Sequence, residues 1–338
     1  MARRGGWTRQ GSPRRFRYYD SRGNRIVDAK KLERIEGLRI PPAWRDVWIS
    51  PRAHAKLQAT GVDAAGRRQY LYHPEYRARQ EQVKYDKLVR FAERLPELRA
   101  TMSEHIELEP LERRWTCAVA LRIIDLTWFR VGSERYARES RTYGVTTLRK
   151  RHVDVRGNRI RFSYRGKGKL QVRRAVVDDE LAAALGTLLA FAGGTRLFRY
   201  RIGDDVFNLT SRTLNEYVHE HLGEDFSAKD FRTWGGTLAA AIAFAERGLP
   251  QSETQARRAV AAVMRSVGEQ LGNTPAVART SYVSPAVVDQ YLDGRTIDDF
   301  RPRRLRIVGA RDTGLNQEEQ ALLSLLRSYR IRRAREAA

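Results

Sequence analysis

The sequence predicts an α+β protein with two parts: a small β-rich N-terminal domain, and a larger, mainly helical domain that contains a small antiparallel sheet. Short alternating segments separated by turn residues fill roughly the first 75 residues. Helical periodicity follows and dominates from residue 178 onward, while residues 152–177 alternate with period two. A chain of 338 residues is long enough to bury one large core and a smaller one.

The N-terminal domain is expected to contain a hairpin and two further strands. The segments RFRYYD and RIVD flank a turn at residues 21–24, which predicts the hairpin. DVWIS is a predicted strand after the break at Pro41 and Pro42, and GRRQYLYHP is a second one that ends at Pro74.

A charged helix is expected at residues 75–98, where Val83, Leu88, Val89 and Phe91 are apolar among charged side chains. Pro96 is expected to end this helix, because proline lacks the N–H group that a helix needs. Such a helix can join two domains, so we predict one domain at residues 1–84 and a second, with a C-terminal extension, at residues 85–338.

The second domain begins with a mostly buried predicted helix at residues 111–129, broken at Gly132. Residues 152–177 alternate through turns at 156–158 and 166–169, which predicts a small antiparallel meander. Nearly all of the segments from residue 178 to residue 338 have helical periodicity, including a link-like stretch at 274–281 that is expected to be the most mobile part. The sequence predicts no role for the tail after about residue 300.

Lysine and arginine total 64 against 40 aspartate and glutamate residues, which gives a net charge of +24. This surplus extends from Arg3 to Arg335 and favours a polyanionic partner, with nucleic acid ahead of an anionic membrane. The sequence has no apolar run of 18 residues, no secretory signal and a single cysteine, Cys117. We therefore expect a cytoplasmic protein with no internal disulfide and no thiolate metal site.

The common catalytic motifs are missing from the sequence. The six histidines are scattered, with no HExxH motif or carboxylate cluster, so no catalytic metal is expected. GKGK at residues 166–169 is followed by Leu170 and flanked by predicted strands, unlike a Walker phosphate loop, and there is no GxSxG elbow. Arginine, lysine and tyrosine remain as candidates for chemistry.

These three residue types can together cleave a phosphodiester. A phenol has an ordinary pKa of about 10, so tyrosine attacks phosphorus only where cations favour the phenolate and neutralise the phosphate. Arginine can hold two nonbridging oxygens, and lysine can protonate the leaving alkoxide. Four segments carry such groups: WFRVGSERY with Arg130, YRGKGKLQV with Lys167 and Lys169, AKDFRTWGG with Lys229 and Arg232, and LGNTPAVARTSYVSP with Asn273 and Tyr282.

Each segment alone also has an ordinary structural interpretation. Arg130 is a candidate helix C-cap, GKGK a solvated turn, and Tyr282 a packing tyrosine. The joint occurrence of the four segments in this order favours the chemical interpretation.

Together, the four segments resemble the type IB DNA topoisomerases of the small poxvirus and bacterial kind. The resemblance rests on the motifs Phe129-Arg130-Val131-Gly132, Gly166-Lys167, Lys229-Asp230-Phe231-Arg232-Thr233, and Gly272-Asn273-Thr274-Pro275 with Tyr282. It covers roughly residues 15–295, including GRRQYLY upstream. It implies a tyrosine recombinase/topoisomerase IB-like fold and an enzyme that relaxes supercoiled duplex DNA by nicking, strand rotation and religation.

The resemblance also implies the roles of the catalytic residues. Tyr282 would attack one strand and form a 3′-phosphotyrosyl bond, Arg130 and Arg232 would hold the nonbridging oxygens, and Lys167 would protonate the 5′ leaving oxygen. No ATP, metal or other cofactor is expected. Poxvirus enzymes carry histidine in place of Asn273, whose neutral amide supplies a hydrogen bond without titrating. They also carry a basic residue in place of Ser133, which leaves the preferred DNA sequence open.

The resemblance further assigns DNA contacts in both domains. It places Arg67, Gln69, Tyr70 and Tyr72 in the major groove, and it places Arg135, Tyr136 and Lys229 against the DNA. Tyr70 and Tyr72 alternate on a strand, so they could instead cover a sheet face. The expected arrangement is a monomer whose N-terminal domain and catalytic domain clamp duplex DNA in the bacterial nucleoid.

Two alternatives remain open. A tyrosine recombinase uses the same chemistry, but usually carries histidine three residues before the second arginine, where this chain has Lys229, and usually has a helical core-binding domain. A non-enzymatic architectural DNA-binding protein would explain the charge of +24 equally well, but not the four segments.

Overall fold

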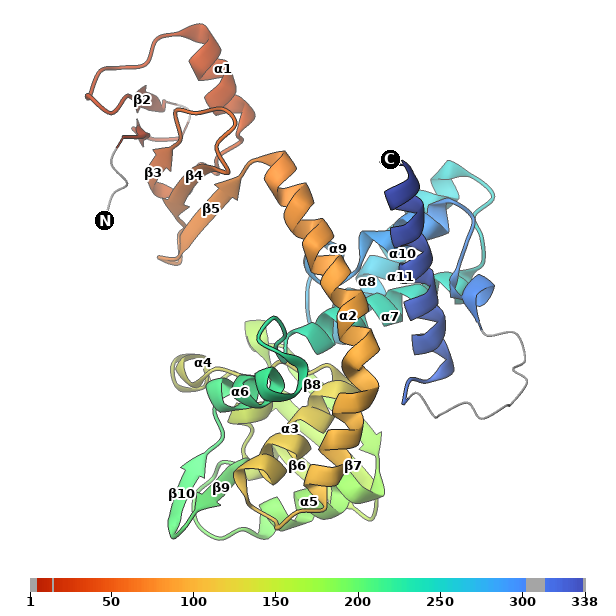
Figure 1. Cartoon of the computed structure of the whole chain (residues 1–338). Coiled ribbons are helices and arrows are strands. Elements are labelled where there is room, and N and C mark those ends of the chain that lie inside the picture. Colours follow the sequence, from red (N-terminus) through yellow and green to blue (C-terminus); the bar gives the residue numbers. More distant parts are fainter. Residues whose placement is uncertain (1–4, 14, 302–313, 337–338) are drawn as a thin grey trace. The chain divides into compact units, whose positions relative to one another are not determined.

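The computed structural model describes residues 5–13, 15–301 and 314–336. The chain divides into two compact units, Met1–Tyr85 and Asp86–Ala338 (Figure 1). Residues 302–313, which belong to the tail without a predicted role, lie outside the described residues.

The N-terminal unit is built on a five-stranded antiparallel sheet with the strand order β2-β1-β3-β4-β5. Its strands are β1 Trp7–Gln10, β2 Arg17–Tyr19, β3 Arg45–Ile49, β4 Leu57–Val62 and β5 Arg68–Tyr72. Helix α1, Ala29–Gly37, contributes Ile35 to a core that also contains Trp7, Ile26, Val47, Ile49 and Ala59. The predicted strands at DVWIS and GRRQYLYHP are confirmed.

Other parts of this unit differ from the prediction. The turn at residues 21–24 closes with a bridge between Tyr19 and Arg25, but the chain then enters α1, whose N-terminus is capped by Asp28. Strand β4 was missed because its sequence, LQATGV, contains Gly61 in its interior. A Cβ atom at Gly61 would lie 2.7 Å from the Trp44 ring, so packing within the unit requires glycine there.

Helix α2, Pro74–Ile106, is 33 residues long and continues through Pro96. The predicted end of this helix at Pro96 is wrong. Leu95, Leu98 and Met102, on both sides of the proline, are buried. Packing therefore holds the helix together where proline removes one hydrogen bond.

The second unit is mainly helical, as predicted. Its helices after α2 are α3 Arg113–Thr127, α4 Glu134–Glu139, α5 Asp179–Ala190, α6 Ser211–Leu222, α7 Asp230–Arg247, α8 Glu253–Leu271, α9 Pro275–Ser281, α10 Pro285–Leu292 and α11 Gln317–Glu336. The predicted meander is a three-stranded antiparallel sheet of β6 Val153–Arg156, β7 Arg159–Arg165 and β8 Gln171–Val177.

A second sheet lies within the region that was predicted to be helical. It is a hairpin of β9 Arg199–Ile202 and β10 Asp205–Asn208, which turns at Gly203. Each strand has four residues, and β10 is exposed along its whole length. Strands of four residues, one of them exposed throughout, leave too little alternation for the sequence to show.

The three-stranded sheet has a buried and a solvent-facing side. Along β7, Ile160, Phe162 and Tyr164 are buried, and α5 packs against β6 and β7 (Figure 1). Phe129, just after α3, packs edge to face against Phe162 and Tyr164, with ring centroids 5.4 and 5.3 Å apart. The segment that follows α3 is thereby anchored to the sheet.

Helix α7 lies at the centre of the second unit. All residues from 231 to 241 are buried, and the helix packs against α3, α8, α10 and α11.

Within the described ranges, no helix combines the length and apolar character that a membrane span requires.

Candidate active site

Two arginines from distant segments meet at the C-terminal end of α8. Arg130 donates from Nη1 to the Leu271 carbonyl at 3.2 Å and from Nη2 to the Gly272 carbonyl at 3.0 Å. Arg232 donates from Nη2 to the same Leu271 carbonyl at 2.8 Å and from Nη1 to the Trp128 carbonyl. The last carbonyls of a helix carry partial negative charge, so this end of α8 stabilises two neighbouring cations.

Close backbone contacts fix the segment that carries Arg130. The Arg130 carbonyl accepts from Val145 N at 2.8 Å, and a Cβ atom at Gly144 would lie 2.4 Å from that carbonyl oxygen. Before it, Trp128 ends α3 in the left-handed conformation, and its ring occupies the space where Gly235 of α7 would carry a Cβ. The glycines at 144 and 235 therefore let the backbone of Arg130 and the N-terminal part of α7 approach closely.

Neither guanidinium is ion-paired with a carboxylate among the described residues. Burial, together with the neighbouring Arg232, lowers the pKa of Arg130 from its ordinary value. Arginine nevertheless stays protonated in proteins. Two adjacent, desolvated positive charges without a counterion favour the binding of an anion.

Tyr282 lies beside Arg232, with the guanidinium carbon 5.0 Å from the centre of its ring. Burial by itself would raise the pKa of this phenol, but Arg232, Arg130 and Lys229 outweigh that effect, so its pKa lies below the ordinary value. The Tyr282 carbonyl accepts from Thr237 Oγ1 of α7 at 3.1 Å. The phenol is thus held against α7 and is easier to ionise than an ordinary tyrosine.

The stretch before Tyr282 is helical. The link expected at residues 274–281 contains helix α9, whose N-terminus is capped by Thr274. A Cβ atom at Gly236 of α7 would lie 3.0 Å from Tyr282 Cβ, so Gly236 allows the tyrosine to approach α7.

Asn273 orients its amide through Arg130. Its Oδ1 accepts from Arg130 Nη2, while its Nδ2 is 3.4 Å from the Leu271 carbonyl. Because the oxygen is occupied by Arg130, the amide nitrogen is the group with donor capacity left for a ligand.

Lys167 lies at the tip of the β7–β8 hairpin and is exposed. The hairpin loop is closed by Gly166 N donating to the Leu170 carbonyl at 2.7 Å. Lys167 lines a cavity of about 450 Å³ together with Arg130, Arg232 and Asn273. The structure therefore brings four of the predicted residues to one cavity. Tyr282 is not one of the residues that line this cavity, but its ring lies next to Arg232, which does line it.

Sequence reasoning missed several residues that line the same cavity: Tyr143, Tyr164, Arg173 and Arg174. Burial raises the pKa of Tyr164 although Arg232 and Arg130 act in the opposite direction, so Tyr164 stays protonated. The same two arginines therefore lie near one tyrosine that ionises more easily and one that ionises less easily. Arg173 and Arg174 lie on β8, a few residues after the hairpin tip that carries Lys167. Their position in the sequence, close to Lys167, could have identified them.

The predicted DNA contacts of the N-terminal unit lie on and next to β5. Tyr70 and Tyr72 are 51% and 36% exposed, with ring centroids 6.3 Å apart. Gln69 alternates with them and is partly buried, and its Nε2 donates to Asp63 Oδ2 at 2.8 Å. Arg67 pairs with the same carboxylate at 2.8 Å. The tyrosines therefore lie on one face of β5, whereas Gln69 points to the other face.

The remaining predicted contacts are exposed residues of the second unit. Arg135 on α4 is ion-paired with Glu139 at 3.0 Å, and Tyr136 beside it is half exposed. Lys229 is the exposed N-cap residue of α7. A pocket beside α4 has a strongly basic lining, which includes Arg138, Arg141, Arg149, Arg151 and Arg196.

Two family models match the chain. The model of the catalytic core of eukaryotic DNA topoisomerase I matches residues 73–296, and the model of the N-terminal domain of bacterial DNA topoisomerase IB matches residues 15–63. The chain belongs to the type IB DNA topoisomerase family. Its fold, with a small antiparallel sheet before a larger helical unit, is the α+β fold predicted for such a topoisomerase.

Viral relatives agree with this assignment. DNA topoisomerase 1B of Acanthamoeba polyphaga mimivirus is 31% identical to this topoisomerase, over 84% of this chain and 86% of the viral protein. DNA topoisomerase I of Monkeypox virus and DNA topoisomerase 1B of Vaccinia virus are each 21% identical, over 80% of this chain and 85% of theirs. The topoisomerase combines a bacterial type of N-terminal domain with a catalytic core shared with eukaryotic and viral enzymes.

Proposed function

We propose that this type IB topoisomerase relaxes supercoiled duplex DNA through a covalent 3′-phosphotyrosyl bond to Tyr282. The observation that supports this most is the position of Tyr282, whose phenol has a lowered pKa, next to Arg232. Arg130 and Arg232 have no carboxylate partner among the described residues, so their charge is available to a phosphate.

The reaction is a reversible transfer of one phosphoryl group. The ionised Tyr282 Oη forms a bond to phosphorus while the bond from phosphorus to the 5′ oxygen breaks, and Lys167 gives that oxygen a proton. Arg130, Arg232 and the Asn273 amide hold the nonbridging oxygens as charge builds up on them. After rotation of the free strand, the 5′ hydroxyl returns its proton to Lys167, attacks phosphorus and releases Tyr282 as the phenolate.

Duplex DNA is the proposed partner. The exposed Tyr70 and Tyr72, with Arg67 and Gln69, are proposed to read the major groove, and Arg135, Tyr136 and Lys229 to contact the DNA beside the active site. We further propose that the topoisomerase acts as a monomer that clamps the duplex in the bacterial nucleoid. Within the bacterial branch, a near relation to the Deinococcus radiodurans enzyme stays a prediction of the sequence motifs.

The decisive experiment uses a suicide DNA substrate that loses its 5′ end after cleavage. The wild-type protein should form a covalent adduct that maps to Tyr282, whereas Tyr282→Phe should bind DNA but form no adduct. Tyr200→Phe, at a buried tyrosine that stacks on Phe207, is the matched control and should form the adduct. An adduct with Tyr282→Phe would refute the assignment.

Plasmid relaxation tests the two alternatives and the absence of cofactors. Substoichiometric protein should relax a plasmid that lacks any special site, in EDTA and without ATP. Activity restricted to one site would favour a recombinase, and retained binding without any nicking would favour an architectural protein. Light scattering after gel filtration tests the monomer.

A further inference from the structure

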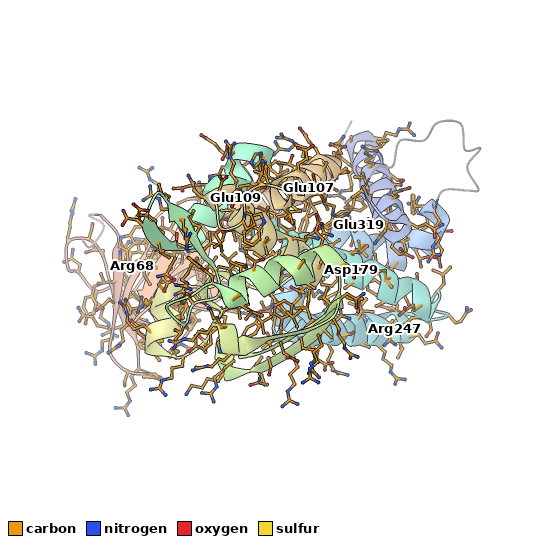
Figure 2. The ribbon with its side chains drawn as sticks, turned by 90° about the horizontal axis from the view of Figure 1, so that it is seen from below. Arg68, Glu107, Glu109, Asp179, Arg247 and Glu319 are labelled. Atoms are coloured by element: carbon orange, nitrogen blue, oxygen red, sulfur yellow. The ribbon has the colours of Figure 1, made fainter. Side chains whose placement is uncertain are left out.

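The C-terminal helix α11 begins after residue 296, where the match to the catalytic-core model ends. Its inner face, with Ala321, Leu322 and Leu325, is buried, and the helix packs against α7 and α10 (Figure 1). The first turn of α11 carries an acid, Glu319, which Figure 2 labels. This side chain is buried, with 4% of its surface exposed. A carboxylate is costly to bury unless it is paired and hydrogen-bonded, so its partners indicate its role.

Glu319 shares one arginine with a second buried acid. Arg99 of α2 donates to the two Glu319 oxygens at 2.8 and 2.9 Å. It also donates to the two oxygens of Asp125, on α3, at 2.7 and 3.0 Å, and to the Gly314 carbonyl at 2.6 Å. All five N–H groups of the guanidinium are therefore used, which fixes its position and that of both carboxylates.

One oxygen of Glu319 serves its own helix. Oε2 accepts from Asn316 N at 3.0 Å, and Asn316 Oδ1 accepts from Glu319 N at 2.8 Å, which is a capping box at the start of α11. The other oxygen, Oε1, accepts from Trp234 Nε1 of α7 at 3.1 Å. A helix cap explains the first set of bonds but not the second.

The network ends at the two segments that hold Arg232. Trp234 is two residues after Arg232 on α7 and is fully buried. Asp125 is three residues before Trp128, whose carbonyl accepts from Arg232 Nη1. Glu319 thus fixes the start of α7 directly, and the end of α3 through Arg99 and Asp125.

We propose that Glu319 is a positioning residue for DNA cleavage, which holds Arg232 in place through Trp234 on one side and through Arg99 and Asp125 on the other. This proposal rests on the proposed function, because it assigns Arg232 to the scissile phosphate. It makes α11 a part of the catalytic unit rather than an appended tail.

The first test compares Glu319→Gln with Glu318→Gln. Both remove one negative charge from the first turn of α11, but only the first breaks the network. Single-turnover cleavage of the suicide substrate should slow by about tenfold or more in Glu319→Gln, because small displacements of a catalytic group have large effects on rate. DNA affinity should stay unchanged, and Glu318→Gln should cleave like the wild type.

A second variant covers the case in which Glu319→Gln fails to fold. Trp234→Phe removes the Nε1 donor together with part of the buried indole ring, and leaves the Arg99 pairs intact. Trp234→Phe should also slow cleavage. Its effect should not add to that of Glu319→Gln, because both variants break the path from Glu319 through Trp234 to Arg232.

The pH profile separates positioning from a loss of stability. Arg232, with Arg130 and Lys229, lowers the pKa of Tyr282, so a displaced Arg232 should move the rise of the cleavage rate to higher pH in both variants. A variant that is merely less stable would keep the wild-type profile. Wild-type rates and profiles in both variants, or additive effects, would overturn the proposal. If Tyr282→Phe cleaved DNA, the proposed function itself would fail instead.

Discussion

Arg67 of the N-terminal unit and the two catalytic arginines of the second unit are partnered in opposite ways. In the N-terminal unit, Arg67 is exposed and ion-paired with Asp63 at 2.8 Å. In the second unit, Arg130 and Arg232 donate to carbonyl and amide oxygens. Asp63 therefore balances the charge of Arg67, whereas the charge of the two catalytic arginines stays available. An exposed, paired arginine suits a weak and reversible contact, and a desolvated, uncompensated pair suits a firm hold on one phosphate.

The largest effect is expected at the uncompensated pair. Arg232→Lys and Arg130→Lys keep the charge but lose the fork that binds two oxygens. Each should slow single-turnover cleavage by about 10²–10³-fold, the usual cost of removing one donor to developing charge. Arg67→Lys is the matched change in the N-terminal unit and should leave the cleavage rate nearly unchanged. Equal losses at all three positions would contradict the comparison.

The hairpin lysine gives the next largest effect. Lys167→Ala should slow cleavage by about 10²-fold or more, because the 5′ alkoxide would leave without a proton. A substrate with sulfur in place of the 5′ bridging oxygen should restore the rate, since a thiolate leaves readily without one. Lys169→Ala, two residues along the same loop, is the control and should lose less. Failure of the sulfur substrate to rescue Lys167→Ala would exclude a role as proton donor.

The elements with a strong local pattern were predictable from the sequence. The alternation of β7, in which Ile160, Phe162 and Tyr164 are buried, predicted the three-stranded sheet. Elements fixed by contacts with other segments were not predictable. Helix α2 runs through Pro96 because buried side chains on both sides hold it, and β4 contains Gly61 because Trp44 lies against it.

The candidate site shows the same limit. Motif spacing identified Arg130, Lys167, Arg232 and Asn273, and the structure brings these four to one cavity. Motif spacing did not predict that the two arginines share the Leu271 carbonyl or that Glu319 is linked to α7, because those contacts join segments far apart in the chain. Residue types were readable from the sequence, whereas their partners depended on tertiary packing.

A smaller effect is expected at Asn273, whose side chain is the uncharged member of the site. The pH–rate profile tests whether it acts only through a hydrogen bond. The wild-type protein should show no limb in its pH–rate profile that belongs to this position, because an amide does not titrate. Asn273→His should introduce a limb below about pH 6.5, since Arg130 next to it disfavours the imidazolium. The rate of cleavage from pH 5 to 8 measures this change. A histidine variant without a new limb would remove the support for a purely hydrogen-bonding role.

The smallest effect is expected at Asp63, the ion-pair partner of Arg67. Hydrogen bonds from Arg67 and Gln69 lower the pKa of Asp63 to about 2, so this carboxylate stays ionised, and Arg67 stays paired, at every working pH. Asp63→Asn should remove the ion pair of Arg67 with Asp63 and raise DNA affinity by a few fold, with a salt dependence steeper by about one phosphate contact. The cleavage rate at saturating DNA should not change. Asp20→Asn adds the same charge at a turn of the same unit but releases no arginine, because Asp20 accepts from Asn24 and the Arg22 backbone. If Asp20→Asn raised affinity as much as Asp63→Asn, net charge alone would account for DNA binding by this unit. The ion pair of Arg67 with Asp63 would then have no specific effect on DNA affinity.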